Sequence, residues 1–191
     1  MTLPAHDPNP QTLAALREAL ATANGAAALE PALAAISAAA WTSLGDPAAH
    51  ERPGALKPGE RQFAVSGYFM LSADGREIVL FAEHGFPEEQ HRLRIPSDLA
   101  HPGWVVANRK PLLLANTDED SGFKQILKTA RMGSAMYSPL IWDGTFIGLL
   151  ITASQARNTY GVEDHALHQL CAEAATAVYM AHDGPAFSAA L

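Results

Sequence analysis

The clearest hydrophobic pattern in the chain lies between Ser134 and Ala153, which reads SAMYSPLIWDGTFIGLLITA. Two apolar runs are joined by Asp143-Gly144, and an Asp-Gly pair between such runs is typical of a tight β-hairpin, because its turn needs positive φ at both central residues. Both runs are apolar at nearly every position, so the pattern predicts a hairpin that is covered on both faces. A sheet covered on both faces can enclose a ligand, and a binding module is therefore the first hypothesis.

Helical periodicity marks both ends of the chain. Pro10 to Ala23 carries leucines at helical spacing and is followed by Asn24-Gly25, a typical stop signal. A second helix is predicted from about Pro31 to Leu44, and a final helix over Glu163 to Ala181, each with one apolar stripe. These patterns predict helices before and after the strands.

The middle of the chain carries a second Asp-Gly hairpin, formed by predicted strands over 63–72 and 77–84. Shorter elements follow: an edge strand over 92–95, a helix over 101–107, a strand over 111–115 and a helix over 123–130. The order of helix, hairpin, mixed middle, hairpin and helix predicts one antiparallel sheet with helices on both faces.

Composition narrows the class of protein. The chain has 191 residues, of which 48% are hydrophobic and 17% charged, as expected for a folded domain. Its formal net charge of −7, without a basic stripe, argues against nucleic acid as a partner. No apolar segment reaches the roughly 18 residues of a membrane span, so we expect no membrane partner. The N-terminus does not resemble a secretory signal, and Cys171 is the single cysteine, which together predict a cytoplasmic location.

Four segments, 82–96, 103–123, 133–151 and 160–178, resemble a GAF domain in order and spacing. The likeness covers roughly residues 29–182 and is clearest in the Pro-Leu…Asp-Gly…Ile-Gly pattern between positions 139 and 148. The resemblance implies an α+β fold, an α/β/α sandwich related to PAS domains, with a central antiparallel sheet of five to six strands. The N- and C-terminal helices would lie on one face, and short helices and loops would cover a ligand-pocket face.

The domain boundaries follow from this comparison. We expect an N-terminal leader and amphipathic helix over residues 1–24, the GAF-like domain over 25–183 and a C-terminal tail over 184–191.

The resemblance places a small molecule under the segment 96–132. We expect a closed, mainly apolar pocket of a few hundred Å³, the low end for ligand sites. Aromatic side chains would supply contact area and a few polar groups would orient the ligand. The candidate ligand-binding residues are Trp104, Asn116, Phe123, Ile126, Met136, Tyr137 and Ser138. The alternative is that Trp104 and Phe123 fill the core, and the sequence names neither the ligand nor a cofactor.

Candidate catalytic and metal-binding groups are few. Free methionine sulfoxide reductases resemble this fold but act through paired cysteines, whereas Cys171 lies alone on the apolar stripe of the final helix. A thiol buried in apolar surroundings is a poor nucleophile. His165 and His168 are one helical turn apart, but their helical angles favour a solvated face over a metal site. From these patterns we expect no catalytic residues, no metal site and no enzyme.

The predicted function is that of a small-molecule-binding sensory or regulatory protein, which passes its signal to a separate partner through a helical dimer face. The alternative is a non-catalytic module for protein interaction or dimerisation with a filled pocket. The second and final helices have alanine-rich outer sides, which predict a two-fold homodimer built with the first helix. The alternative is a monomer in which Leu13, Leu16 and Leu20 fold back on their own chain.

Overall fold

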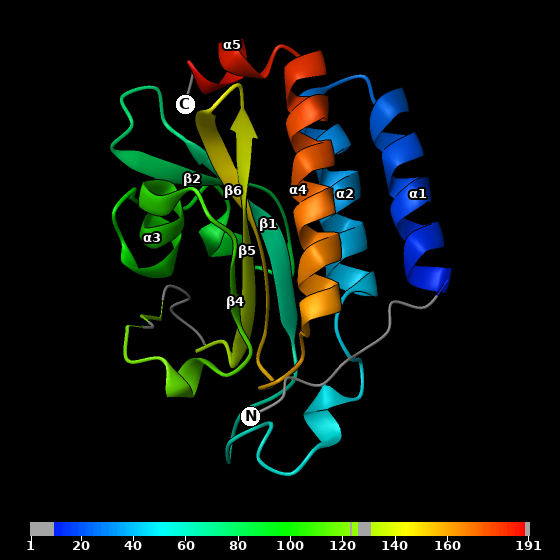
Figure 1. Ribbon diagram of the computed structural model, residues 1–191, viewed down its shortest axis with the longest axis vertical. Coiled ribbons are helices and arrows are strands. Elements are labelled where there is room, and N and C mark those ends of the chain that lie inside the picture. Colours follow the sequence, from blue (N-terminus) through cyan, green and yellow to red (C-terminus); the bar gives the residue numbers. More distant parts are fainter. Residues whose placement is uncertain (1–9, 123, 126–130, 190–191) are drawn as a thin grey trace.

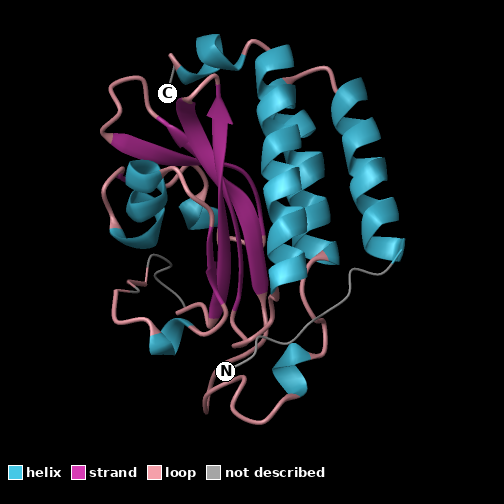
Figure 2. Cartoon of the chain, in the orientation of Figure 1, coloured by secondary structure: helices cyan, strands magenta, loops and turns pink. Residues whose placement is uncertain are grey.

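The computed structural model describes residues 10–122, 124–125 and 131–189, and it arranges them as a helical layer, a sheet and a cover of short elements (Figures 1 and 2). The helices are α1 (Pro10–Gly25), α2 (Leu29–Ser43), α3 (Ala100–Asn108), α4 (Val162–Ala181) and α5 (Gly184–Ser188). The single-turn helices are η1 (Ala49–Glu51), η2 (Glu88–Gln90) and η3 (Thr117–Glu119). Within the described part of the chain, no helix has both the length and the apolar character needed to cross a membrane.

Six antiparallel strands form the sheet, in the spatial order β3-β2-β1-β6-β5-β4. Their bounds are β1 (Ala64–Leu71), β2 (Glu77–His84), β3 (Arg94–Pro96), β4 (Leu112–Leu114), β5 (Ser134–Trp142) and β6 (Thr145–Ser154). The two predicted hairpins, β1–β2 and β5–β6, meet along β1 and β6 at the centre. The predicted α+β fold with an antiparallel sheet is therefore confirmed.

The β5–β6 hairpin has the predicted turn. Asp143 and Gly144 have φ values of 47° and 73°, the positive angles that this turn requires. Both faces of the hairpin are buried: Leu149 belongs to the core under the cover, and Leu150 belongs to the core under the helices. Burial on both faces explains why the two runs do not alternate between apolar and polar residues.

Three helices cover one face of the sheet. α2 and α4 pack against the strands, and α1 packs on α2 at the outer edge of this layer (Figure 1). Within α1, Leu16 is buried and Leu20 is partly buried against the same core, while Leu13 remains exposed. Two of the three leucines therefore pack within their own chain.

The C-terminal segment holds a helix that the sequence did not predict, because a five-residue helix has no periodicity to recognise. Tertiary contacts hold α5: the ring centroid of Phe187 lies 4.5 Å from that of Phe81, and the hydroxyl groups of Tyr179 and Ser188 are 2.6 Å apart. The helix predicted over 123–130 lies outside the described residues.

Candidate functional site

Three polar side chains meet on the covered face of the sheet. Tyr137 projects from β5 into the core beneath α3, where Val105 is fully buried. The ring of His101, from α3, stacks on Tyr137 with centroids 6.4 Å apart, and its Nε2 lies 3.3 Å from Oδ2 of Asp120. Burial, reinforced by the negative charge of Asp120, raises the pKa of Tyr137 above its ordinary value. We call these three residues the tyrosine cluster.

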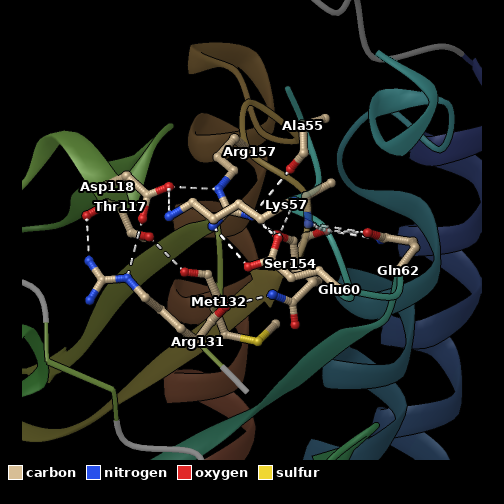
Figure 3. Close-up of polar contacts among 12 residues, drawn as sticks. Ala55, Lys57, Glu60, Gln62, Thr117, Asp118, Arg131, Met132, Ser154 and Arg157 are labelled. Carbon is tan, nitrogen blue, oxygen red and sulfur yellow. Dashed lines mark hydrogen bonds and ion pairs between the residues drawn. The ribbon is translucent and has the colours of Figure 1, made fainter. Parts of the chain in front are cut away.

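A second group of polar side chains joins several loops through ion pairs (Figure 3). We call it the arginine cluster; its members are Lys57, Glu60, Asp118, Arg131 and Arg157. Its centre is Arg157, from the loop after β6, whose side chain is only 3% exposed. The guanidinium binds both carboxylate oxygens of Glu60, and its Nε donates to Asp118 over 2.9 Å. Asp118 also pairs with Lys57 at 2.7 Å and with Arg131 at 3.4 Å. The cluster thus joins four loop segments that are distant in sequence.

The charges of this cluster stabilise one another. Burial alone would raise the pKa of Glu60, but hydrogen bonds from Arg157 and the Lys57 amide outweigh it and lower the pKa. The Lys57 ammonium and the Arg157 guanidinium likewise hold the pKa of Asp118 below its ordinary value, against the opposing effect of burial. Both carboxylates are therefore ionised at neutral pH.

One short loop connects the two clusters. Asp118 belongs to the arginine cluster, and Asp120, two residues later, pairs with His101. The Thr117 hydroxyl donates to the carbonyl of Met132 over 2.6 Å, and its amide donates to the carbonyl of Gly133 over 2.9 Å. These bonds fix the loop to the start of β5, from which Tyr137 projects.

The predicted site residues of β5 fall on opposite faces of the sheet. Tyr137 faces the cover, whereas Met136 packs against Ala40 and Tyr160 on the helical side. Ser138 also faces the helices, where its hydroxyl lies 2.7 Å from Nδ1 of His168. Successive side chains of a strand alternate between faces, so the three cannot line one pocket.

The remaining predicted site residues have different surroundings. Trp104 of α3 is 41% exposed. The Asn116 side chain accepts a hydrogen bond from the Asp118 amide and donates one to Glu119, so it caps η3. Phe123 and Ile126 lie outside the described residues. Tyr137 is therefore the one predicted residue that the structure brings into the tyrosine cluster.

Most residues of both clusters were not among the site residues predicted from the sequence. His101, Asp120 and Arg157 share no motif: His101 lies in α3, whereas Asp120 and Arg157 lie in loops, and the three are distant in sequence. The expectation of a solvated face for His165 and His168 is wrong for His168, which is fully buried between Ser138 and Thr152. His168 lies at the margin of the apolar stripe of α4, and its burial depends on the hydroxyl groups of Ser138 and Thr152 on the sheet, which the pattern of apolar residues does not reveal.

A family model described as GAF domain matches residues 10–179. The chain belongs to the GAF domain family. No curated protein matches the chain.

Solved structures agree on the GAF fold. A GAF domain from the phosphoenolpyruvate-protein phosphotransferase of Coxiella burnetii is 21% identical, with a TM-score of 0.70 over 92% of this chain and 96% of that one. A free methionine-R-sulfoxide reductase from Neisseria meningitidis is 17% identical, with a TM-score of 0.71 over 97% and 98%. A putative GAF sensor protein from Burkholderia vietnamiensis is 20% identical, with a TM-score of 0.64 over 94% and 96%.

These comparisons correct the expectation that the protein is not an enzyme. Free methionine-R-sulfoxide reductases share the fold of this GAF domain, so the fold itself supports catalysis, and an enzymatic role is open to this chain. The thiol of Cys171 is buried in α4, and burial raises its pKa to about 12. Because Cys171 is the single cysteine of the sequence, an enzymatic role of this GAF domain would depend on groups other than an exposed thiolate.

Proposed function

We propose that this GAF domain protein binds a small molecule at the covered face of its sheet and has a regulatory role. The proposal depends on one observation: Tyr137 and the largely buried His101 stack beside the apolar core under the cover, and Asp120, 35% exposed, pairs with His101 at its margin. Ligand sites are mainly apolar and contain a few converging polar groups, often with shifted pKa values. The raised pKa of Tyr137 fits this description.

Strand β5 gives a physical route from this site to the helical layer. Tyr137 faces the cover, while the adjacent Ser138 contacts His168 of α4 from the other side of the same strand. A ligand that shifts Tyr137 would move the backbone that carries Ser138, and with it the contact to α4. We propose that α4 passes this change to a separate signalling or regulatory partner.

The outer stripe of α4 suits contact with another helix. Val162 and Leu170 are 52% and 51% exposed, and the exposed positions Ala166, Ala177 and Ala181 continue the stripe at helical spacing, with the exposed Glu173 as the one charged residue within it. An exposed apolar stripe of this kind is typical of helix–helix interfaces. It supports the proposal of a two-fold homodimer through the helical layer.

Native mass spectrometry of protein purified from cells tests the ligand proposal. We expect a retained small molecule in the unchanged protein and a clear loss of it in Tyr137→Phe, which removes only the hydroxyl. Met136→Leu is the matched control, because it changes the adjacent residue on the other face at nearly constant volume. Absence of any retained molecule, or equal losses in the two variants, would contradict the proposal.

An interaction module is the second candidate, and one surface favours it. β4 pairs with β5 only as far as Tyr137, so the rest of β5 is a sheet edge. A groove of about 370 Å³ lies beside this edge, lined in part by Pro111, Ile141 and the exposed Trp142. Under this alternative, side chains of the protein itself fill the covered face, and the purified protein retains no small molecule. The masses of Tyr137→Phe and Met136→Leu then differ from that of the unchanged protein only by the substituted side chain.

A further inference from the structure

A cavity of about 430 Å³ opens beside the arginine cluster, separate from the tyrosine cluster. It lies between the loop before β1, the residue that follows β6 and the segment that leads into β5. Its lining includes two arginines, two glutamines, a phenylalanine and a glutamate: Arg61, Arg131, Gln125, Gln155, Phe63 and Glu60. This volume lies within the range of small-molecule sites.

Positive charge is in excess around this cavity. In the described part of the chain, Lys57, Arg131 and Arg157 share two carboxylates, those of Glu60 and Asp118, and Arg61 adds a fourth positive charge at the cavity (Figure 3 draws all of these except Arg61). The two acidic residues that follow Asp118 have other partners. Glu119 accepts a hydrogen bond from the side-chain amide of Asn116, and Asp120 pairs with His101. An excess of two positive charges is therefore concentrated in one region of a protein whose formal net charge is −7.

The two arginines that line the cavity differ in the ion pairs and hydrogen bonds that their guanidinium groups make. Arg131 pairs with Asp118 and donates to the carbonyl of Thr117 over 2.9 Å, which fixes its position. Arg61 is exposed and has no ion-pair partner among the described residues. Glu60 adds little free negative charge, because both of its oxygens bind the buried Arg157. The cavity thus presents one anchored guanidinium and one that is available to a ligand.

We propose that this cavity binds a small organic anion with a carboxylate or phosphate group. The guanidinium groups of Arg61 and Arg131 would bind the anionic group, since guanidinium matches the geometry of both oxyanions. The Phe63 ring offers an apolar wall to the rest of the molecule, and the Gln155 side chain, whose Nε2 donates to the carbonyl of Arg131 over 2.8 Å, adds a polar group to the lining. This site is distinct from the tyrosine cluster, and the proposal does not depend on the ligand proposed there.

Titration of the full chain with simple probes tests this inference. Inorganic phosphate and benzoate represent the two anionic groups, and benzamide is the uncharged match of benzoate. Binding can be followed by NMR, through shifts of the arginine Nε–H signals and of the Gln155 side-chain amide. We expect at least one anion to bind, benzamide to bind at least about tenfold more weakly, and Arg61→Gln to weaken anion binding about tenfold or more. The stronger of the two anions identifies the oxyanion class.

Arg76→Gln is the control, because Arg76 lies in the β1–β2 turn with its side chain 85% exposed and carries the same change in net charge. It should leave anion binding unchanged. The proposal is overturned if neither anion binds at concentrations of about 10 mM. It is also overturned if benzamide binds as tightly as benzoate, or if Arg61→Gln and Arg76→Gln have equal effects. None of these results bears on the retained molecule expected at Tyr137.

Discussion

At the scale of single residues, His168 is a buried histidine with a hydrogen-bond partner at each ring nitrogen. Its imidazole is fully buried between the sheet and α4, with Nδ1 2.7 Å from the Ser138 hydroxyl and Nε2 3.1 Å from the Thr152 hydroxyl. Thr152 continues the chain of hydrogen bonds to Ser66 over 2.9 Å. Burial, with a contribution from the charge of His165, lowers the pKa of His168 to about 3. The folded protein therefore holds this histidine neutral.

This environment makes stability depend on pH. The unfolded chain takes up a proton at His168 as the pH falls below the ordinary value of 6.5, whereas the folded chain does so only near pH 3. The folded state thus loses stability as the pH falls through this window, by about 1.4 kcal/mol per pH unit. Between pH 7 and pH 5 we expect His168 to account for a loss of about 2 kcal/mol, measured by urea unfolding.

His168→Gln should remove most of this pH dependence, although the variant is less stable at pH 7 because the buried hydrogen bonds are disturbed. His182→Gln, at the partly exposed end of α4, serves as the control and should keep the slope of the unchanged protein. Equal slopes for the protein and for His168→Gln between pH 5 and pH 7 would show that His168 is not the group responsible.

At the scale of secondary-structure elements, close packing of β6 against β1 fixes the centre of the sheet. Gly148 of β6 is paired with Met70 of β1 and with Leu140 of β5. A Cβ atom at this position would lie 2.6 Å from the carbonyl oxygen of Phe69. This oxygen belongs to β1, which is paired with β2 on one side and β6 on the other, so moving it away would cost considerable free energy. The glycine of the Ile-Gly pair in the GAF-like pattern therefore has a steric reason.

Gly148→Ala is expected to destabilise the protein by about 3 kcal/mol, because the new methyl group overpacks the sheet. The measurement is the midpoint of urea unfolding at constant m-value. Gly25→Ala is the matched control: nothing lies within 4 Å of its Cβ position at the end of α1, and the same substitution there should be neutral or slightly stabilising. A Gly148→Ala variant as stable as Gly25→Ala would mean that β1 and β6 separate more easily than this packing implies.

At the scale of the whole molecule, the helical layer leaves its apolar outer stripe on α4 uncovered within the single chain. Leu170→Glu places a charge at the middle of this stripe without touching the core. We expect the unchanged protein to sediment as a dimer at micromolar concentration and the variant as a monomer of unchanged stability, because a buried unpaired charge at an interface is strongly unfavourable.

Trp104→Glu provides the comparison, since Trp104 is a similarly exposed apolar residue of α3, on the opposite side of the sheet. It should leave sedimentation unchanged. A monomeric unchanged protein would contradict the dimer and remove the basis for a signal passed through this face.

The sequence by itself determined the long helices, the two hairpins and the fold. Asp143-Gly144 specified its hairpin because only certain residues accept positive φ, and unbroken apolar runs in β5 and β6 indicated a sheet buried on both faces. The periodicity of α2 and α4 gave their lengths to within about two residues, because burial of one helical face repeats every turn.

Only the tertiary structure decided which polar groups meet. The face on which Tyr137 lies depends on strand phase, and an error of one position exchanges it with Met136 and Ser138. His168 is buried because two hydroxyl groups on the sheet satisfy its nitrogens, which no pattern of apolar residues reveals. Arg157 and Asp118 meet because loops of irregular path bring them together, and the path of such loops depends on contacts that are distant in sequence.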